Sequence, residues 1–103
     1  DHIGEVVGGP VRLIPGGPEH VYRVGLVTGA AADLIPEAAQ RGLDALITGE
    51  GPHHTYHDAI EHGVNAFYAG HYATETWGVR ALGAHLEERF ELPYEFIDMP
   101  TGL

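Results

Sequence analysis

The chain has 103 residues, of which 44% are apolar, and its formal net charge at pH 7 is −10 with the histidines counted as neutral. This length allows a single domain with a modest core, and the acidic charge disfavours non-specific binding to nucleic acid because phosphate backbones are repelled. The absence of cysteine excludes disulfide bonds, thiolate zinc sites and cysteine nucleophiles. No apolar run approaches the ~18 residues of a membrane span and no signal segment opens the chain, so we expect a cytoplasmic protein without a membrane partner.

The first 20 residues are rich in glycine and proline, which predicts an irregular lead-in or two weak strands. The apolar pieces Val6–Val7 and Val11–Ile14 would form those strands. From Val21 onward the pattern becomes regular. We therefore expect residues 1–103 to form one α/β domain whose core lies within residues 21–100.

Apolar segments rich in β-branched residues alternate with helical patterns in the rest of the chain. The predicted strands cover residues 21–29, 43–50, 64–71 and 94–99. The predicted helices cover residues 33–42, 55–63 and 74–90. Strands that alternate with helices favour a mostly parallel sheet, in which the carboxyl ends of the strands meet along one edge.

The ends of these helices are marked by residues that suit them. Asp33 is a candidate N-cap of the first helix, and Gly42 and Gly63 supply left-handed C-caps for the first and second. In the third helix, apolar residues recur at steps of three and four, which predicts a stripe that faces the core. The stripe consists of Val79, Leu82, Leu86 and Phe90, and one turn further back it reaches Glu75.

Two segments of the chain echo each other at a spacing of 21 residues. "RGLDALITGE" (41–50) and "HGVNAFYAGH" (62–71) align without gaps. The simplest interpretation is a pair of similar helix–strand units. The echo nevertheless places Glu50 and His71 at equivalent points just past the ends of two strands, where open α/β sheets bind ligands.

His71 and Glu75 are the first candidates for a metal site. Imidazole nitrogen and carboxylate oxygen both suit zinc or another first-row ion. Two protein ligands are too few for a tight site, so further donors are required. The alternative for Glu75 is structural, because a partly desolvated acid in the first turn of a helix can be held by the N-terminal amides.

The loop "TGEGPHHTYHD" holds further candidates: Glu50, His53, His54 and His57. His54 and His57 are three residues apart and His53 and His57 four, so either pair can share a helical face. The alternative is that this segment is a solvated loop and helix start. The remaining histidines look like surface positions; they are His2, His20, His62 and His85.

Other catalytic chemistries lack the residues they need. The chain contains no serine, which excludes a Ser–His–Asp triad, and no lysine, which excludes Schiff-base catalysis. Glycine-rich nucleotide-binding motifs are absent. Histidines, carboxylates and backbone amides remain, and these favour metal-assisted hydrolysis over covalent catalysis.

The run "GHYATE" (70–75), together with "LDALITGE" and "HGVNAFYAGH", resembles the NGG-interacting-factor-like dinuclear metal centre family. Many of its members are called GTP cyclohydrolase 1 type 2 homologues, and the resemblance is to their C-terminal part. It implies an α/β fold, a centre of two divalent ions (Zn, Mn, Fe or Mg) and a homo-oligomer, usually a hexamer. By this resemblance His71 and Glu75 are metal ligands, and the other ligands belong to an N-terminal half that this chain lacks.

The same resemblance ranks Glu50, His54 and His57 as residues behind the metal ligands or facing the substrate. We therefore expect a divalent-metal-binding, hydrolase-like protein that acts on a phosphoester or a purine ring, with an incomplete site in this chain. His54 or His57 would move a proton or orient the substrate. The alternative is a non-catalytic oligomeric module for regulation or interaction, with a structural metal, or a half-protein completed by a partner.

Overall fold

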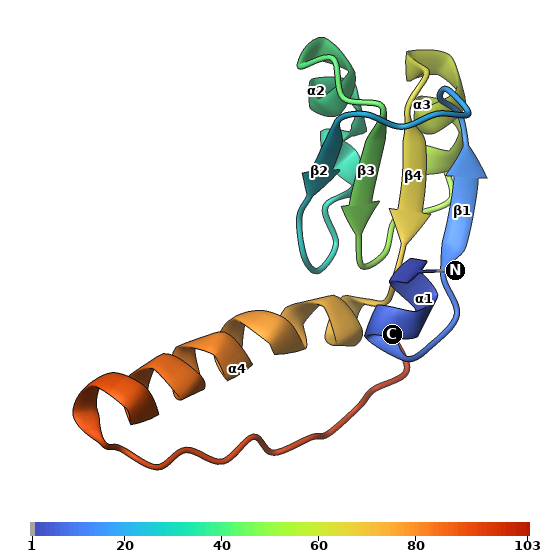
Figure 1. Ribbon diagram of the computed structural model, residues 1–103. Coiled ribbons are helices and arrows are strands. Elements are labelled where there is room, and N and C mark those ends of the chain that lie inside the picture. Colours follow the sequence, from blue (N-terminus) through green and yellow to red (C-terminus); the bar gives the residue numbers. More distant parts are fainter. Residues whose placement is uncertain (1) are drawn as a thin grey trace.

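The computed structural model describes residues 2–103 as a four-stranded sheet with two helices on one face and a long helix that leads away from it (Figure 1). The strands are β1 (Arg12–Pro15), β2 (Val24–Leu26), β3 (Ala45–Thr48) and β4 (Asn65–Tyr68). Their order across the sheet is β1-β4-β3-β2, with β2, β3 and β4 parallel and β1 antiparallel to β4. The predicted α/β fold with a mostly parallel sheet is confirmed.

The helices from residue 33 onward follow the predicted alternation, the first two with shorter bounds and the third with an earlier start, whereas the helix at residues 2–7 was not predicted. The helices are α1 (His2–Val7), α2 (Ile35–Gln40), α3 (Thr55–His62) and α4 (His71–Phe90), and a short 3₁₀ turn, η1 (Ala32–Leu34), leads into α2. Leu34 rather than Asp33 is the N-cap of α2 and makes no side-chain bond there, so the prediction for Asp33 was wrong. Gly42 and Gly63 both adopt the left-handed conformation (φ 69° and 71°), as predicted.

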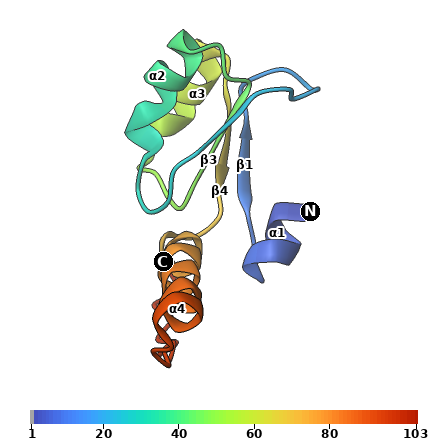
Figure 2. The same cartoon turned by 60° about the vertical axis from the view of Figure 1, so that its left-hand side comes forward.

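The core lies between the sheet and the two helices that cover one of its faces, α2 and α3 (Figure 2). Leu46, Ala66 and Ile14 stand opposite one another on β3, β4 and β1 and are all buried. Ile35 of α2 is fully buried against this row, which stabilises the fold by roughly 1.5–3 kcal/mol. The opposite face of the sheet carries exposed apolar side chains, with Leu13 49% and Leu26 69% exposed.

Asp44 and Asn65, which occupy equivalent positions in the two echoing segments, both accept hydrogen bonds from backbone amides. The carboxylate of Asp44 accepts hydrogen bonds from the amides of Tyr22 and Arg23, at 2.9 and 3.0 Å. These bonds hold the pKa of Asp44 below its ordinary value. At the equivalent position, Asn65 accepts a bond from the amide of Gly17, at 3.0 Å. Each side chain thus fixes a loop that leads to or from a neighbouring strand.

Two predicted strands were wrong. Val6–Val7 ends helix α1, and residues 94–99 form no strand. The C-terminal segment runs back along α4, away from the sheet, so its backbone has no neighbouring strand to pair with (Figure 1). It is held instead by Tyr72, whose hydroxyl donates to Asp98 at 2.6 Å and accepts from the amide of Met99 at 2.7 Å.

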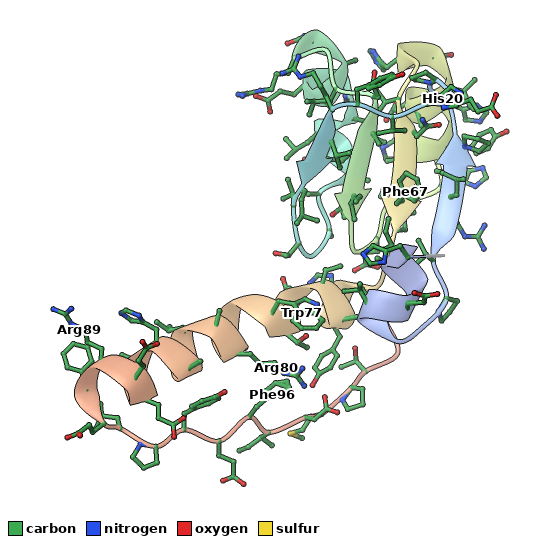
Figure 3. All side chains as sticks on the ribbon, viewed as in Figure 1. His20, Phe67, Trp77, Arg80, Arg89 and Phe96 are labelled. Atoms are coloured by element: carbon green, nitrogen blue, oxygen red, sulfur yellow. The ribbon has the colours of Figure 1, made fainter. Side chains whose placement is uncertain are left out.

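The predicted core-facing stripe of α4 was also wrong. The helix begins at His71 and projects from the edge of the sheet rather than packing on its face (Figure 1). Val79, Leu82 and Phe90 are consequently 58–59% exposed, and Arg80 lies over the ring of Phe96 in the C-terminal segment (Figure 3). Trp77 lines a pocket with residues of α1 and β2. No helix within residues 2–103 has both the length and the apolar content required to cross a bilayer.

Candidate metal site

Gly29, Gly49 and Gly70 follow the three parallel strands, and they allow the ends of these strands to lie close together at one edge of the sheet. The amide of Glu50 donates to the carbonyl of Gly29 at 3.0 Å, and the amide of Gly70 donates to that of Gly49 at 2.8 Å. A Cβ atom on Gly49 would lie 2.3 Å from the carbonyl oxygen of Gly29 and 2.6 Å from the Cα of His71. Only glycine fits here, and the close approach sets Glu50 and His71 side by side.

Glu50, His71 and Glu75 form a connected row of side chains at this edge. The Nδ1 atom of His71 lies 2.6 Å from Oε1 of Glu50, and its Nε2 atom lies 3.4 Å from Oε1 of Glu75. His71 is the first residue of α4 and Glu75 follows one turn later, so both point from the same side of the helix. All three side chains are between 37% and 53% exposed, which leaves the row open to solvent.

Two buried threonines support the backbone around this row. The hydroxyl of Thr74 accepts from the amide of Gly29 at 3.1 Å and donates to the carbonyl of His71 at 3.1 Å. The hydroxyl of Thr48 accepts from the amide of Ala31 at 3.1 Å. The loop after β2 is thereby tied to the first turn of α4, and this contact was missed in the sequence, although Thr74 lies within "GHYATE".

The hydrogen bond to Glu50 is the main reason that the pKa of His71 is raised, and the negative charge of Glu75 acts in the same direction. Two states of the row follow from these contacts. A protonated imidazole donates at both nitrogens and pairs with both carboxylates. A neutral imidazole that donates from Nδ1 to Glu50 leaves the Nε2 lone pair directed toward Glu75, where a cation can take the place of the proton.

The geometry of the row fits a metal ion between His71 and Glu75. Zinc bonds of about 2.1 Å in a tetrahedral shell set neighbouring donor atoms roughly 3.4 Å apart, which matches the separation of Nε2 and Oε1. Gly29 (φ 76°) lies directly beside this space, and a larger residue would intrude there, since a Cβ atom on Gly29 would lie 2.8 Å from Oε1 of Glu75. Glu50 faces the other nitrogen, and within residues 2–103 no three His, Asp or Glu side chains converge on one point.

A family model described as Duf34/NIF3 (NGG1p interacting factor 3) matches residues 1–101. The chain belongs to this family. It is 47% identical over 103 residues to a Deinococcus radiodurans protein named GTP cyclohydrolase 1 type 2 homolog, and the match covers 100% of this chain and 39% of that protein. A Halobacterium salinarum protein of the same name is 50% identical over 94 residues, a match that covers 91% of this chain and 37% of the relative.

Solved structures agree with this membership. The protein TTHA1606 from Thermus thermophilus superposes with a TM-score of 0.92 at 47% identity, over 100% of this chain and 41% of that one. The protein ybgI, whose function is described as unknown, gives a TM-score of 0.92 at 41% identity, over 98% of this chain and 41% of its own. The chain thus spans about two fifths of the length of these relatives and corresponds to their C-terminal part. The resemblance to the NIF3 family is confirmed.

The structural alternative for Glu75 was wrong. In this NIF3-family chain α4 starts at His71, so Glu75 lies beyond the first turn, whose amides it cannot reach. Its side chain is 53% exposed, so the expected partial desolvation is also absent. The carboxylate has His71 as its only ion-pair partner among residues 2–103.

The histidines of the loop that leads into α3 make contacts of their own. His54 is the N-cap residue of α3 and His57 packs its ring edge-on against Tyr56, at 5.4 Å between ring centroids. Both are exposed, and in the described part of the chain neither bonds to Glu50, His71 or Glu75. His53 instead lines a pocket together with Glu50. Roles for His54 and His57 in catalysis stay predictions.

The pH dependence of stability gives a test of the row in metal-free protein. Because the pKa of His71 is raised in the folded chain, its contribution to stability is complete below about pH 6.5, the ordinary imidazole value, and is lost as the pH rises through the raised pKa. We expect the urea midpoint in chelator to fall as the pH rises above this value. The His71→Ala variant should lack this part of the pH dependence, and an unchanged profile in that variant would contradict the assignment.

Proposed function

We propose that the chain binds a divalent metal ion between Nε2 of His71 and Oε1 of Glu75 and forms part of a hydrolytic centre. The observation that carries this proposal is the row Glu50–His71–Glu75, in which the imidazole is oriented on one side and faces a carboxylate at 3.4 Å on the other. A carboxylate behind a ligating histidine is the usual outer partner of a metal site, because it fixes the tautomer and raises the basicity of the ring.

The donor set suits zinc, manganese or iron, and magnesium through Glu75. Such an ion, when bound, supplies an activated water for attack on a phosphoester or a purine-ring carbon. Glu50 holds the Nδ1 proton of His71, and Glu75 balances the positive charge. His54 or His57 would move a proton or orient the substrate from the neighbouring loop.

The two donor atoms of His71 and Glu75 do not fill the coordination shell of a metal ion, so additional ligands are required. We propose that these come from a second copy in a homo-oligomer, a hexamer by resemblance, or from the part of the relatives' length that this chain does not cover. The exposed apolar side chains on the open face of the sheet and on α4 support such an assembly, since Leu26, Val79 and Phe90 are each more than half exposed.

The second candidate is a non-catalytic module for regulation or interaction that holds a structural metal. One observation favours it. Only two donor atoms in the described residues face a common point, and such a shell binds an ion without the further groups that turn over a substrate. The two candidates differ in turnover rather than in metal content.

Metal content and turnover together test the proposal. Protein loaded with zinc or manganese and then dialysed should retain the ion in elemental analysis, and should hydrolyse a phosphoester or nucleotide from a screened set. Glu75→Gln, which removes the charge but not the shape, should lower both. Glu88→Gln, an exposed acid near the other end of α4, is the matched control. An ion retained without turnover supports the structural module, and no retained ion would remove both candidates for this chain.

A further inference from the structure

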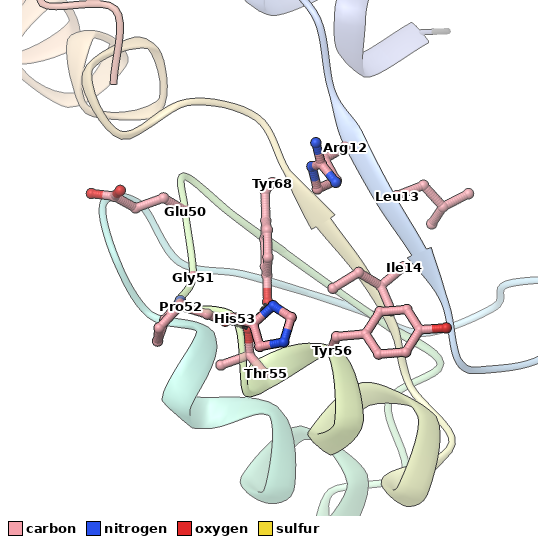
Figure 4. A pocket seen from close by; sticks show the side chains of 10 residues that line it. All are labelled: Arg12, Leu13, Ile14, Glu50, Gly51, Pro52, His53, Thr55, Tyr56 and Tyr68. Carbon is pink, nitrogen blue, oxygen red and sulfur yellow. Dashed lines mark hydrogen bonds between the residues drawn. The ribbon is translucent and has the colours of Figure 1, made fainter.

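A pocket of about 560 Å³ opens beside the candidate metal site (Figure 4). Its walls come from β1, the end of β4 and the loop that leads into α3, and Glu50 stands at one side. Its volume lies within the range of roughly 300–1,000 Å³ that small-molecule sites occupy in proteins. Apolar walls with a few polar groups are typical of such sites, and this pocket has that composition.

Arg12 lies at the pocket and differs from the other four cationic residues of the chain. Among residues 2–103 its side chain makes no hydrogen bond, ion pair or aromatic contact. The others are engaged: Arg23 with the carbonyl of Arg41, Arg41 with Glu37, Arg80 with Phe96 and Arg89 with Phe90. An exposed guanidinium whose donors have no partner within residues 2–103 is suited to an anion on a chain of net charge −10, and phosphate matches its forked geometry.

Aromatic rings form the rest of the recognition surface. The hydroxyl of Tyr68 lies 2.6 Å from Oγ1 of buried Thr55, so the ring is held in place. Tyr56 is held edge-on against His57, with the ring planes at 88°, and the imidazole of His53 projects into the same space (Figure 4). Rings that are fixed in this way favour a flat ligand, because little conformational entropy is lost when it stacks on them.

The charged residues of the pocket determine how a ligand is oriented in it. Glu50 is negative, but its carboxylate is bound to His71 at 2.6 Å and belongs to the candidate metal site. Arg12 stands apart from it, on the far side of Tyr68 (Figure 4). An anionic group is therefore attracted to the Arg12 side of the pocket, and the rest of the ligand extends toward Glu50.

We propose that this pocket binds a small phosphorylated compound with a flat ring, its phosphate at Arg12 and its ring against Tyr56 and Tyr68. Binding depends on side chains of this pocket and requires no metal. Only the further step, that such a compound is the substrate, rests on the proposed function. In that case Arg12 anchors a phosphate that is not itself cleaved, and the reacting group lies at the Glu50 side.

Calorimetric titration in excess chelator tests the proposal with three probes. Phenyl phosphate combines the anion and the ring, inorganic phosphate offers the anion alone, and phenol offers the ring alone. We expect saturable binding of phenyl phosphate in the millimolar range or tighter, and weaker binding of the other two. Arg12→Gln should weaken phenyl phosphate binding roughly tenfold or more, because a hydrogen bond to a charged group is lost. Tyr56→Leu should weaken phenyl phosphate but leave inorganic phosphate unchanged.

Arg89→Gln is the matched control, since it removes the same charge near the end of α4 and should bind as the unchanged chain does. Circular dichroism confirms that the variants are folded. The proposal is overturned if phenyl phosphate does not saturate, if Arg12→Gln binds it as well as the unchanged chain, or if Arg89→Gln weakens it equally. Because chelator is present throughout, these outcomes do not depend on whether the protein retains a metal ion. Metal retention is measured separately and tests only the proposed function.

Discussion

The His71→Ala variant is expected to lose almost all metal binding. The imidazole supplies one of the two donor atoms that face a common point, and the remaining carboxylate of Glu75 is about half exposed, so water competes for the ion. Changing even an outer partner of a metal ligand costs roughly 10–100-fold in affinity, so removal of the ligand itself should cost more than about 100-fold. Titration of zinc against a chromophoric chelator measures this difference directly.

Two variants make the measurement specific. His85→Ala removes an exposed imidazole from the C-terminal part of α4 and should leave the affinity unchanged. Glu50→Gln keeps an acceptor for the Nδ1 proton but removes the charge, so its affinity should fall by only about 10–100-fold. If His71→Ala binds zinc as tightly as the His85→Ala control, the ion lies elsewhere and the assigned site is wrong. In all folded variants with the imidazole intact, affinity should rise with pH as His71 loses its proton.

The Gly49→Ala substitution is expected to produce a large loss of stability. The added Cβ would lie 2.3 Å from the carbonyl oxygen of Gly29, 2.6 Å from Cα of His71 and 2.8 Å from the carbonyl oxygen of Gly70. All three are backbone atoms, so no side chain can rotate away and the strand ends must separate. We expect the free energy of unfolding to fall by at least about 3 kcal/mol, which is a large part of the roughly 5–15 kcal/mol typical of a domain. Urea denaturation followed by circular dichroism measures it.

Gly78→Ala provides the opposite expectation with the same chemical change. Gly78 lies inside α4, and a Cβ atom there would meet nothing within 4 Å. Alanine is favoured over glycine in a helix by roughly 0.5–1 kcal/mol, so this variant should be slightly more stable than the unchanged chain. Equal stabilities of the two variants would show that the three strand ends do not approach as closely as described.

The row of side chains at the sheet edge could be anticipated only in part. The gapless echo of two helix–strand units predicted that Glu50 and His71 lie at equivalent points just past the ends of two strands, and they form a hydrogen bond of 2.6 Å. This prediction succeeded because equivalent points of parallel strands meet at one edge. The separation of His71 and Glu75 and the support from Thr74 depend on side-chain orientation, which no pattern specifies. The pocket that includes Arg12 joins β1 to a loop that is distant in the sequence, so it too was not anticipated.

The sequence by itself determined the alternation of strands and helices, the two glycine C-caps and the family-like motif, since these depend on local apolar periodicity and on backbone freedom at single residues. Tertiary structure alone decided where α4 and the C-terminal segment lie. The periodicity of Val79, Leu82 and Phe90 marks an apolar stripe but not its partner, and here the helix leaves the sheet instead of covering it. The segment at residues 94–99 has strand-like composition, yet a strand needs a neighbouring backbone, and α4 carries this segment beyond the reach of one.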